Sequence, residues 1–282
     1  MVRIIQDFDR LRAMKTDFIF RAAAAALSIV SICGCFDRKE APREAPAARS
    51  KEEFAKCDRA TLERLLLRGR VEPADMDGAF FAGLPALREL DISETAVQTL
   101  PPALLDGSLP ALEHLYLADC KSLKSVPAEL FAKNPKLTYV NLDRSGISAL
   151  PDSLGDASAI KWLRVNGTAI EKFPASLAKL RGLQRIYARK CRLEAVPAEL
   201  QGMEKLEDIA LDGNGKIKEC PQWVADLPAL KNLSLSGTGV EKLPEDLSGF
   251  KKLASLSIAG CPMTKEERHR IREALPSLSI AF

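Results

Sequence analysis

The residues of this chain that could take part in chemistry are few and lie far apart. Its 282 residues include seven cysteines and two histidines, His114 and His269. None of the GxSxG, HExxH or phosphate-loop patterns of common catalytic sites occurs. The run Asp212-Gly213-Asn214-Gly215 resembles the start of a calcium loop, but Lys216 stands where the next oxygen ligand belongs. We therefore expect no catalytic residue, no metal site and no cofactor, and predict that the protein is not an enzyme.

The cysteines raise the alternatives of disulfide bonds or metal binding. Outside the N-terminal segment no CxxC pair occurs, which argues against the usual zinc-ligand spacing. Cys57 lies with Phe54 on the apolar side of a short helix predicted near residue 50, where we expect it to be buried. A disulfide between Cys57 and Cys120 is an open alternative.

An apolar run near the N-terminus predicts export. Residues 22–33 read AAAAALSIVSIC after Lys15 and Arg21, and this stretch is about half as long as the ~20 residues that a spanning helix needs. A basic region followed by a short apolar region is typical of a secretory signal. The alternative is a buried or interfacial helix with an incidental cysteine.

The end of this run, Cys33-Gly34-Cys35, resembles the lipobox of bacterial lipoproteins. The resemblance implies that residues 1–34 are removed and that Cys35 carries the lipid. Met14-Lys15 looks like a natural signal start, so residues 1–13 are interpreted as a misassigned extension. Residues 35–49 are charged and rich in Pro and Ala, so we predict a disordered tether. In bacterial lipoproteins an Asp directly after the lipidated cysteine often signals retention in the inner membrane, and Phe36 stands there instead. We therefore expect a lipid-anchored protein of the cell envelope, in the outer membrane of a Gram-negative bacterium. The net charge of +3 gives no general attraction for nucleic acid.

A pattern LxxLxL recurs eight times at intervals of 23 to 25 residues. Its first positions are Leu87, Leu112, Leu137, Ile160, Leu183, Leu206, Leu230 and Leu253. The apolar residues three and five places later indicate short strands with one buried face. Eight places after each start comes a small residue that can satisfy buried backbone groups. These residues are Thr95, Cys120, Ser145, Thr168, Cys191, Asn214, Thr238 and Cys261. A glycine often precedes this place, and an apolar-Pro pair follows it, which turns the chain away from the strand.

These motifs resemble the leucine-rich-repeat family, in the variety with LPxxL in the second half of each repeat. The resemblance implies an α/β solenoid: an arc with a parallel sheet on its concave side, irregular or short helical segments on its convex side, and helical caps at both ends. We assign residues 50–86 to an N-terminal helix and a degenerate capping repeat with a strand near Leu65. Residues 87–263 hold the repeats, and 264–282 a capping helix and a partial strand. Ser50 with Glu53 and Thr264 with Glu267 are candidate capping boxes for the two helices.

The outward positions of each strand, two, four and six places after its first residue, form the predicted concave face. All three tyrosines and one of the two tryptophans of the chain occupy such positions. Tyr, Trp and Arg are enriched in binding hot spots. The candidate binding residues are His114, Tyr116, Tyr139, Asn141, Trp162, Arg164, Arg185, Tyr187 and Arg189. The alternative is that the aromatic residues pair across neighbouring strands for stability alone.

The sequence therefore favours a membrane-tethered scaffold whose concave face recognises a protein or peptide. The three arginines suit a partner with acidic and apolar groups, while Glu89, Asp91, Asp208 and Asp212 flank them and repel misplaced acids. An envelope structural or adhesion protein that binds glycan or peptidoglycan is one alternative, and a non-exported regulator of the same family is another.

Overall fold

The computed structural model describes residues 46–282. The predicted signal segment, the lipidation site Cys35 and the tether up to residue 45 lie outside the described residues. Everything below concerns the repeat region and its two ends.

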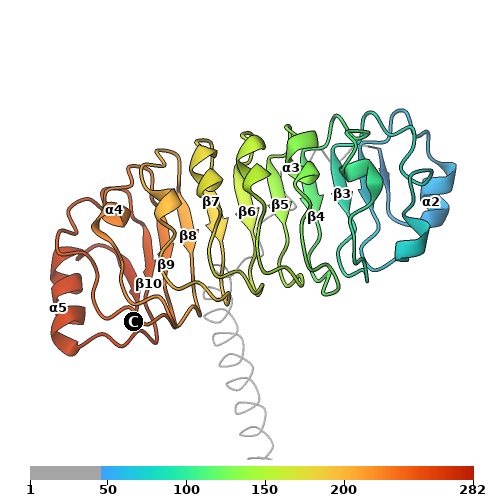
Figure 1. Ribbon diagram of the computed structural model, residues 1–282. Coiled ribbons are helices and arrows are strands. Elements are labelled where there is room, and N and C mark those ends of the chain that lie inside the picture. Colours follow the sequence, from blue (N-terminus) through green and yellow to red (C-terminus); the bar gives the residue numbers. More distant parts are fainter. Residues whose placement is uncertain (1–45) are drawn as a thin grey trace, which may run out of the picture. The chain divides into compact units, whose positions relative to one another are not determined.

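The repeats form one parallel sheet of eleven short strands, which follow one another in chain order (Figure 1). The strands are β1 (Ala47–Ala48), β2 (Arg64–Leu66), β3 (Glu89–Asp91), β4 (His114–Tyr116), β5 (Tyr139–Asn141), β6 (Trp162–Arg164), β7 (Arg185–Tyr187), β8 (Asp208–Ala210), β9 (Asn232–Ser234), β10 (Ser255–Ser257) and β11 (Ser279–Ala281). Equivalent residues of successive repeats lie side by side, as Leu163 and Ile186 do across β6 and β7. The predicted solenoid with a parallel sheet is confirmed.

Short helical segments lie on the other side of the sheet and return the chain to the next strand (Figure 1). They are η1 (Pro73–Asp75), η2 (Pro102–Leu104), α3 (Glu129–Lys133), η3 (Asp152–Asp156), η4 (Ala175–Lys179), η5 (Ala198–Leu200) and α4 (Gln222–Ala225), where η marks a 3₁₀ helix. The prolines of the apolar-Pro pairs stand directly before five of them, at Pro101, Pro151, Pro174, Pro197 and Pro221. Proline fixes φ there and donates no hydrogen bond, so the strand cannot continue.

A single apolar interior runs through all the repeats. On β6, for example, Leu163 and the following Val165 are fully buried, and so is Leu177 from the segment behind them. This repeat buries seven apolar side chains between Ile160 and Leu180, and it can bury them only by stacking on its neighbours. The side chains on the opposite face of the sheet lie outside this interior.

Each of the strands β2 to β10 is followed by a residue in the left-handed conformation, seven places after the start of the repeat. Gly167, Gly213, Gly237 and Gly260 hold this place with φ between 66° and 73°. Other repeats place Glu94, Asp119, Arg144 and Lys190 there, with φ between 51° and 60°. The backbone N–H of this residue donates to a carbonyl of the next repeat, as Gly167 does to Arg189 at 2.7 Å. This bond holds the unfavourable conformation in the repeats that lack glycine.

Helices cover both ends of the interior. Helix α2 (Lys51–Lys56) begins after Ser50, whose side chain accepts from the backbone N–H of Glu53. The Glu53 carboxylate accepts a hydrogen bond from the backbone N–H of Arg49 at 2.7 Å, and not from that of Ser50. Only half of the predicted capping box therefore forms. Helix α5 (Lys265–Ala274) begins after Thr264 in the same way, and strand β11 follows it as expected.

Two details near the N-terminal end differ from the sequence-based expectation. Residues 46–49 belong to the predicted tether, yet Ala47 and Ala48 form β1 and pair with β2. The small side chain of Ala48 is completely buried, and the Pro46 carbonyl accepts from Glu63 N and Arg64 N. Cys57 is half-buried at the end of α2 rather than buried within it.

Candidate binding surface on the sheet

Four aromatic residues form a strip across the middle of the concave face. Tyr116, Tyr139, Trp162 and Tyr187 come from the four consecutive strands β4 to β7. Register places Tyr139 directly beside Trp162. We call these four residues the aromatic strip. The sequence predicted that they share one face, and the structure brings them together there.

Three of the four rings pack on one another, and the Tyr187 ring contacts arginines instead. The ring centroids of Tyr116 and Tyr139 are 4.9 Å apart, and those of Tyr139 and Trp162 are 5.6 Å apart. The His114 ring also meets Tyr139 edge-on at 6.1 Å. Tyr139 is only 7% exposed, whereas Tyr116, Trp162 and Tyr187 are half-buried. The expectation that Tyr139 lies open to a partner is therefore wrong: its ring supports its neighbours instead.

The arginines beside the strip are engaged in ion pairs within the chain. Arg164 pairs with Asp143 at 2.6 Å, Arg185 with Asp208 at 3.2 Å, and Arg189 with Asp212 at 2.8 Å. The prediction of flanking acids that repel a partner's carboxylates is thus corrected for Asp208 and Asp212. These two acids bind the arginines, because register places them one strand further on at the same height. These ion pairs neutralise the positive charges of the arginines, so the arginines attract an acidic partner only weakly.

The same arginines cover the faces of the aromatic rings. The Arg185 guanidinium lies 4.4 Å from the centroid of the Trp162 ring. Arg164 and Arg189 lie 5.5 Å and 5.2 Å from the Tyr187 ring. Cation–π contacts and the carboxylates together fix the orientation of each guanidinium. The result is a rigid surface of rings and guanidinium planes.

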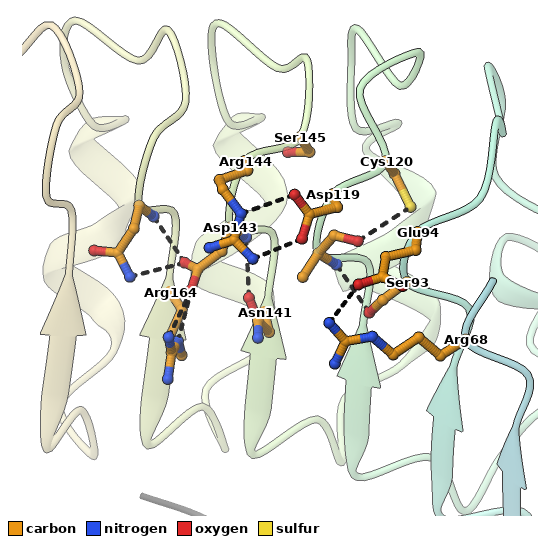
Figure 2. A network of polar contacts seen from close by, with 12 residues as sticks. Arg68, Ser93, Glu94, Asp119, Cys120, Asn141, Asp143, Arg144, Ser145 and Arg164 are labelled. Atoms are coloured by element: carbon orange, nitrogen blue, oxygen red, sulfur yellow. Dashed lines mark hydrogen bonds and ion pairs between the residues drawn. The ribbon is translucent and has the colours of Figure 1, made fainter. Parts of the chain in front are cut away.

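The outermost row of the concave face, six places into each repeat, serves the backbone of the sheet. The Asp143 carboxylate accepts from Asn166 N at 2.8 Å, and the Asn166 amide oxygen accepts from Arg189 N at 2.8 Å. Ser93 Oγ does the same for Ala118 N (Figure 2). Ser93 and Asp143 are only 2% exposed. This row, predicted to be free for recognition, is in large part structural.

A second polar row runs inside the solenoid, at the small residues eight places into each repeat. The hydroxyl of Thr168 donates to the Val165 carbonyl at 2.8 Å, and the Cys191 thiol of the next repeat donates to the same carbonyl at 3.1 Å. Two other Thr–Cys pairs repeat this arrangement, Thr95 with Cys120 and Thr238 with Cys261. The prediction that the small residues at this place satisfy backbone groups inside the solenoid is confirmed for these cysteines.

Asn214 takes the same internal place and makes three hydrogen bonds by itself. Its amide nitrogen donates to the Ala188 and Leu211 carbonyls, and its oxygen accepts from Leu193 N. The side chain is therefore committed to the backbone, as expected for a repeat turn. Cys57 and Cys120 are free thiols, so the alternative of a disulfide between them is wrong. In residues 46–282 no group of three or more His, Cys, Asp or Glu could hold a metal ion.

Burial shifts the pKa of two residues of this surface, His114 and Tyr187. It lowers the pKa of His114, although the nearby Glu89 and Glu113 act in the opposite direction. It raises the pKa of Tyr187 to about 12, helped by the charge of Asp208, whose carboxylate accepts a hydrogen bond from the phenol with an O···O distance of 3.1 Å. Both side chains are therefore neutral near pH 7.

The concave face also extends further toward the N-terminus than the candidate residues suggested. Strand β2 adds Arg64 and Leu66, which lie beside Glu89 and Asp91 of β3. Arg64 pairs with Glu89 at 2.6 Å, and Leu66 is half-buried. The apolar places Leu62, Leu65 and Leu67 had already indicated this strand. Counting the outward positions two and four places after Leu62 would have identified Arg64 and Leu66 from the sequence.

No helix within residues 46–282 has the length and apolar character required to cross a membrane.

The fold and its periodic surface define a repeat solenoid. The family described as a leucine-rich repeat region matches residues 86–227, half of the chain. The chain therefore belongs to the leucine-rich-repeat family.

Known members resemble parts of this chain. Disease resistance protein RPS4B of Arabidopsis thaliana is 32% identical over 136 residues, which cover 48% of this chain and 11% of RPS4B. The chain thus spans a small part of that relative's length. An internalin from Listeria monocytogenes superposes with a TM-score of 0.60 at 20% identity, covering 79% of this chain and 68% of the internalin. The ectodomain of the Arabidopsis receptor kinase HAESA, in complex with an IDA peptide hormone ligand, gives 0.58 at 23% identity and covers 77% and 37%. At these identities the two structures show the fold alone.

Proposed function

We propose that this protein is a membrane-tethered scaffold that binds a protein or peptide partner on its concave face. The observation that carries the proposal is the aromatic strip. Tyr116, Trp162 and Tyr187 stay half-buried on the surface of the solenoid, and half-buried Tyr and Trp are the usual anchors of protein interfaces. The HAESA ectodomain, of the same fold, is a peptide-binding member of the family.

The fixed geometry of the strip supports tight binding of a protein. The rings are held by one another and by arginines that are themselves paired with acids. Side chains that are already ordered lose little conformational entropy when a partner covers them.

The same geometry disfavours the glycan alternative. A sugar ring packs on an open aromatic face, but the Arg185 guanidinium lies over the Trp162 ring. Tyr187 has Arg164 and Arg189 near its ring. A peptide can instead place backbone and apolar side chains along the edges of these groups.

The tethering part of the proposal is supported by the sequence: an apolar run of signal length that ends in Cys35. It is tested by metabolic labelling with a fatty-acid analogue, which we expect to label the wild-type protein and not Cys35→Ala. Label that persists in Cys35→Ala, or is absent from both, would contradict the anchor. The outer membrane is the location we propose, and fractionation of the envelope tests it.

The binding part is tested by crosslinking the protein in its native envelope and comparing variants. Trp162→Ala and Tyr187→Ala should each reduce partner capture at least about tenfold, as expected for hot-spot residues. Trp223→Ala, on the helix α4 behind the sheet, is the matched control and should capture as the wild type does. Thermal melts establish that the variants fold. Capture that is unchanged in both concave variants would reject this surface.

A further inference from the structure

The charges of the concave face are paired with one exception among the residues that the structure describes. Arg64 pairs with Glu89, Arg164 with Asp143, Arg185 with Asp208, and Arg189 with Asp212. Arg68, at the outer end of β2, pairs with Glu94 of the next turn at 2.6 Å (Figure 2). Asp91, in the middle row of β3, is the concave residue left without a cation.

The surroundings of Asp91 offer it little neutralisation. The residue is half-buried, and its carboxylate accepts one hydrogen bond, from the backbone N–H of Ser93 at 3.0 Å. The positive charge of Arg68 interacts with the Asp91 carboxylate through space, but the Arg68 guanidinium is bound to Glu94. A half-buried carboxylate therefore faces outward with one neutral donor.

Asp91 also lies between two apolar surfaces. Register places Leu66 of β2 on one side of it and Tyr116 of β4 on the other. A lysine or arginine carries a long apolar stem below its charge, which packs well on such surfaces. An aromatic ring next to the carboxylate also attracts a cation. The three residues together match a basic side chain better than an acidic or purely apolar one.

We infer that the partner inserts a lysine or arginine side chain between Leu66 and Tyr116 and pairs it with Asp91. This inference rests on the proposed function and names the chemistry of the partner segment: a basic residue next to apolar residues that reach the aromatic strip. It replaces the sequence-based expectation of an acidic partner. The inference departs from that expectation because the arginines beside the strip already pair with acids of the chain.

The test uses the full chain and a displayed library of random decapeptides as the probe. Enriched peptides should share a lysine or arginine at one position. Asp91→Asn should weaken a selected peptide about tenfold, and replacing the basic residue of the peptide by norleucine should weaken it equally. The two changes together should be no worse than one, because they remove the same contact. In Asp91→Asn the new amide oxygen still accepts from Ser93 N, so the turn remains formed.

The matched control is Asp156→Asn, an exposed acid of η3 on the other side of the sheet, which should bind as the wild type does. A charge reversal gives a second readout: Asp91→Lys should prefer the peptide whose basic residue is changed to glutamate. Peptides that lack a shared basic residue, or that bind Asp91→Asn as well as wild type but not Trp162→Ala, would overturn this inference alone. A library that yields no binder, or binders indifferent to both Asp91→Asn and Trp162→Ala, would overturn the proposed function as well.

Discussion

Arg164 on β6 reaches back to Asp143 at the end of β5, and their ion pair joins the aromatic strip to the backbone of the sheet. Arg164 Nη2 lies 2.6 Å from Asp143 Oδ2, with side-chain exposures of 16% and 3%. The other carboxylate oxygen accepts from both the backbone and the side chain of Asn166 (Figure 2). Arg164 also lies near the Tyr187 ring. One buried acid thus orders a backbone turn and a residue of the candidate surface.

Removing that acid should destabilise the protein strongly. Asp143→Ala leaves Arg164 and Asn166 N without their acceptor, and we expect the free energy of unfolding to fall by about 3 kcal/mol. Glu194→Ala removes the exposed pair with Lys216 and should lower the free energy of unfolding far less, because solvent screens exposed ion pairs. Urea unfolding measures both. Equal losses in the two variants would contradict the structural role of Asp143.

A methyl group at Gly146 should not be tolerated. A Cβ there would lie 2.3 Å from the Lys121 carbonyl oxygen and 2.9 Å from that of Leu123, so two repeats would have to move apart. We expect Gly146→Ala to lower stability by about 2 kcal/mol. At Gly78 nothing lies within 4 Å, and Gly78→Ala should leave the melting temperature equal or slightly higher. The prediction is wrong if Gly146→Ala and Gly78→Ala have the same melting temperature.

Asn214, the one asparagine of the internal polar row, should contribute strongly to the stability of the fold. Asn214→Ala would leave two buried carbonyls and one buried N–H unsatisfied. We expect a loss of about 3 kcal/mol in the free energy of unfolding. Asn232 on β9 makes one exposed hydrogen bond, to Asp208, and Asn232→Ala should cost well under half as much. Chemical denaturation of the two variants tests this ordering.

Stability should decline in alkaline solution. Burial raises the pKa of the Cys220 thiol to about 12 and that of Tyr187 to about 12, whereas an unfolded thiol ionises near about 8.5. Above that pH the unfolded chain loses protons that the folded chain retains, so the free energy of unfolding falls as pH rises from about 8.5 toward 12. Below about pH 8 the contribution is complete.

Urea unfolding between about pH 7.5 and 10.5 measures this slope. Cys220→Ala should be less stable at every pH because it leaves a small cavity, but its stability should fall less steeply with pH. Val224→Ala, a buried truncation on the neighbouring α4, should be destabilised with the wild-type slope. Equal slopes in Cys220→Ala and the wild type would show that the thiol does not contribute.

The repeat architecture followed from the sequence because its signal is local and repeated. Leu163 and Val165 alternate with polar residues in the same way as their counterparts in each repeat, so stacking fixes which face is buried. The inward cysteines were predictable for the same reason. Residues 46–49 were not: their pairing with β2 depends on Ala48 fitting against the first repeat, which composition does not reveal.

The composition of the candidate surface also followed from the sequence, but its electrostatics did not. The register alone placed Tyr116, Trp162 and Tyr187 on one face. Which arginine meets which acid depends on side chains from different repeats reaching the same point. The tertiary structure decided that the arginines beside the strip are neutralised, that Tyr139 is covered, and that Asp91, within the described part of the chain, remains without a cation. Periodicity determines the direction of each side chain, whereas pairing depends on distances that only the packed repeats create.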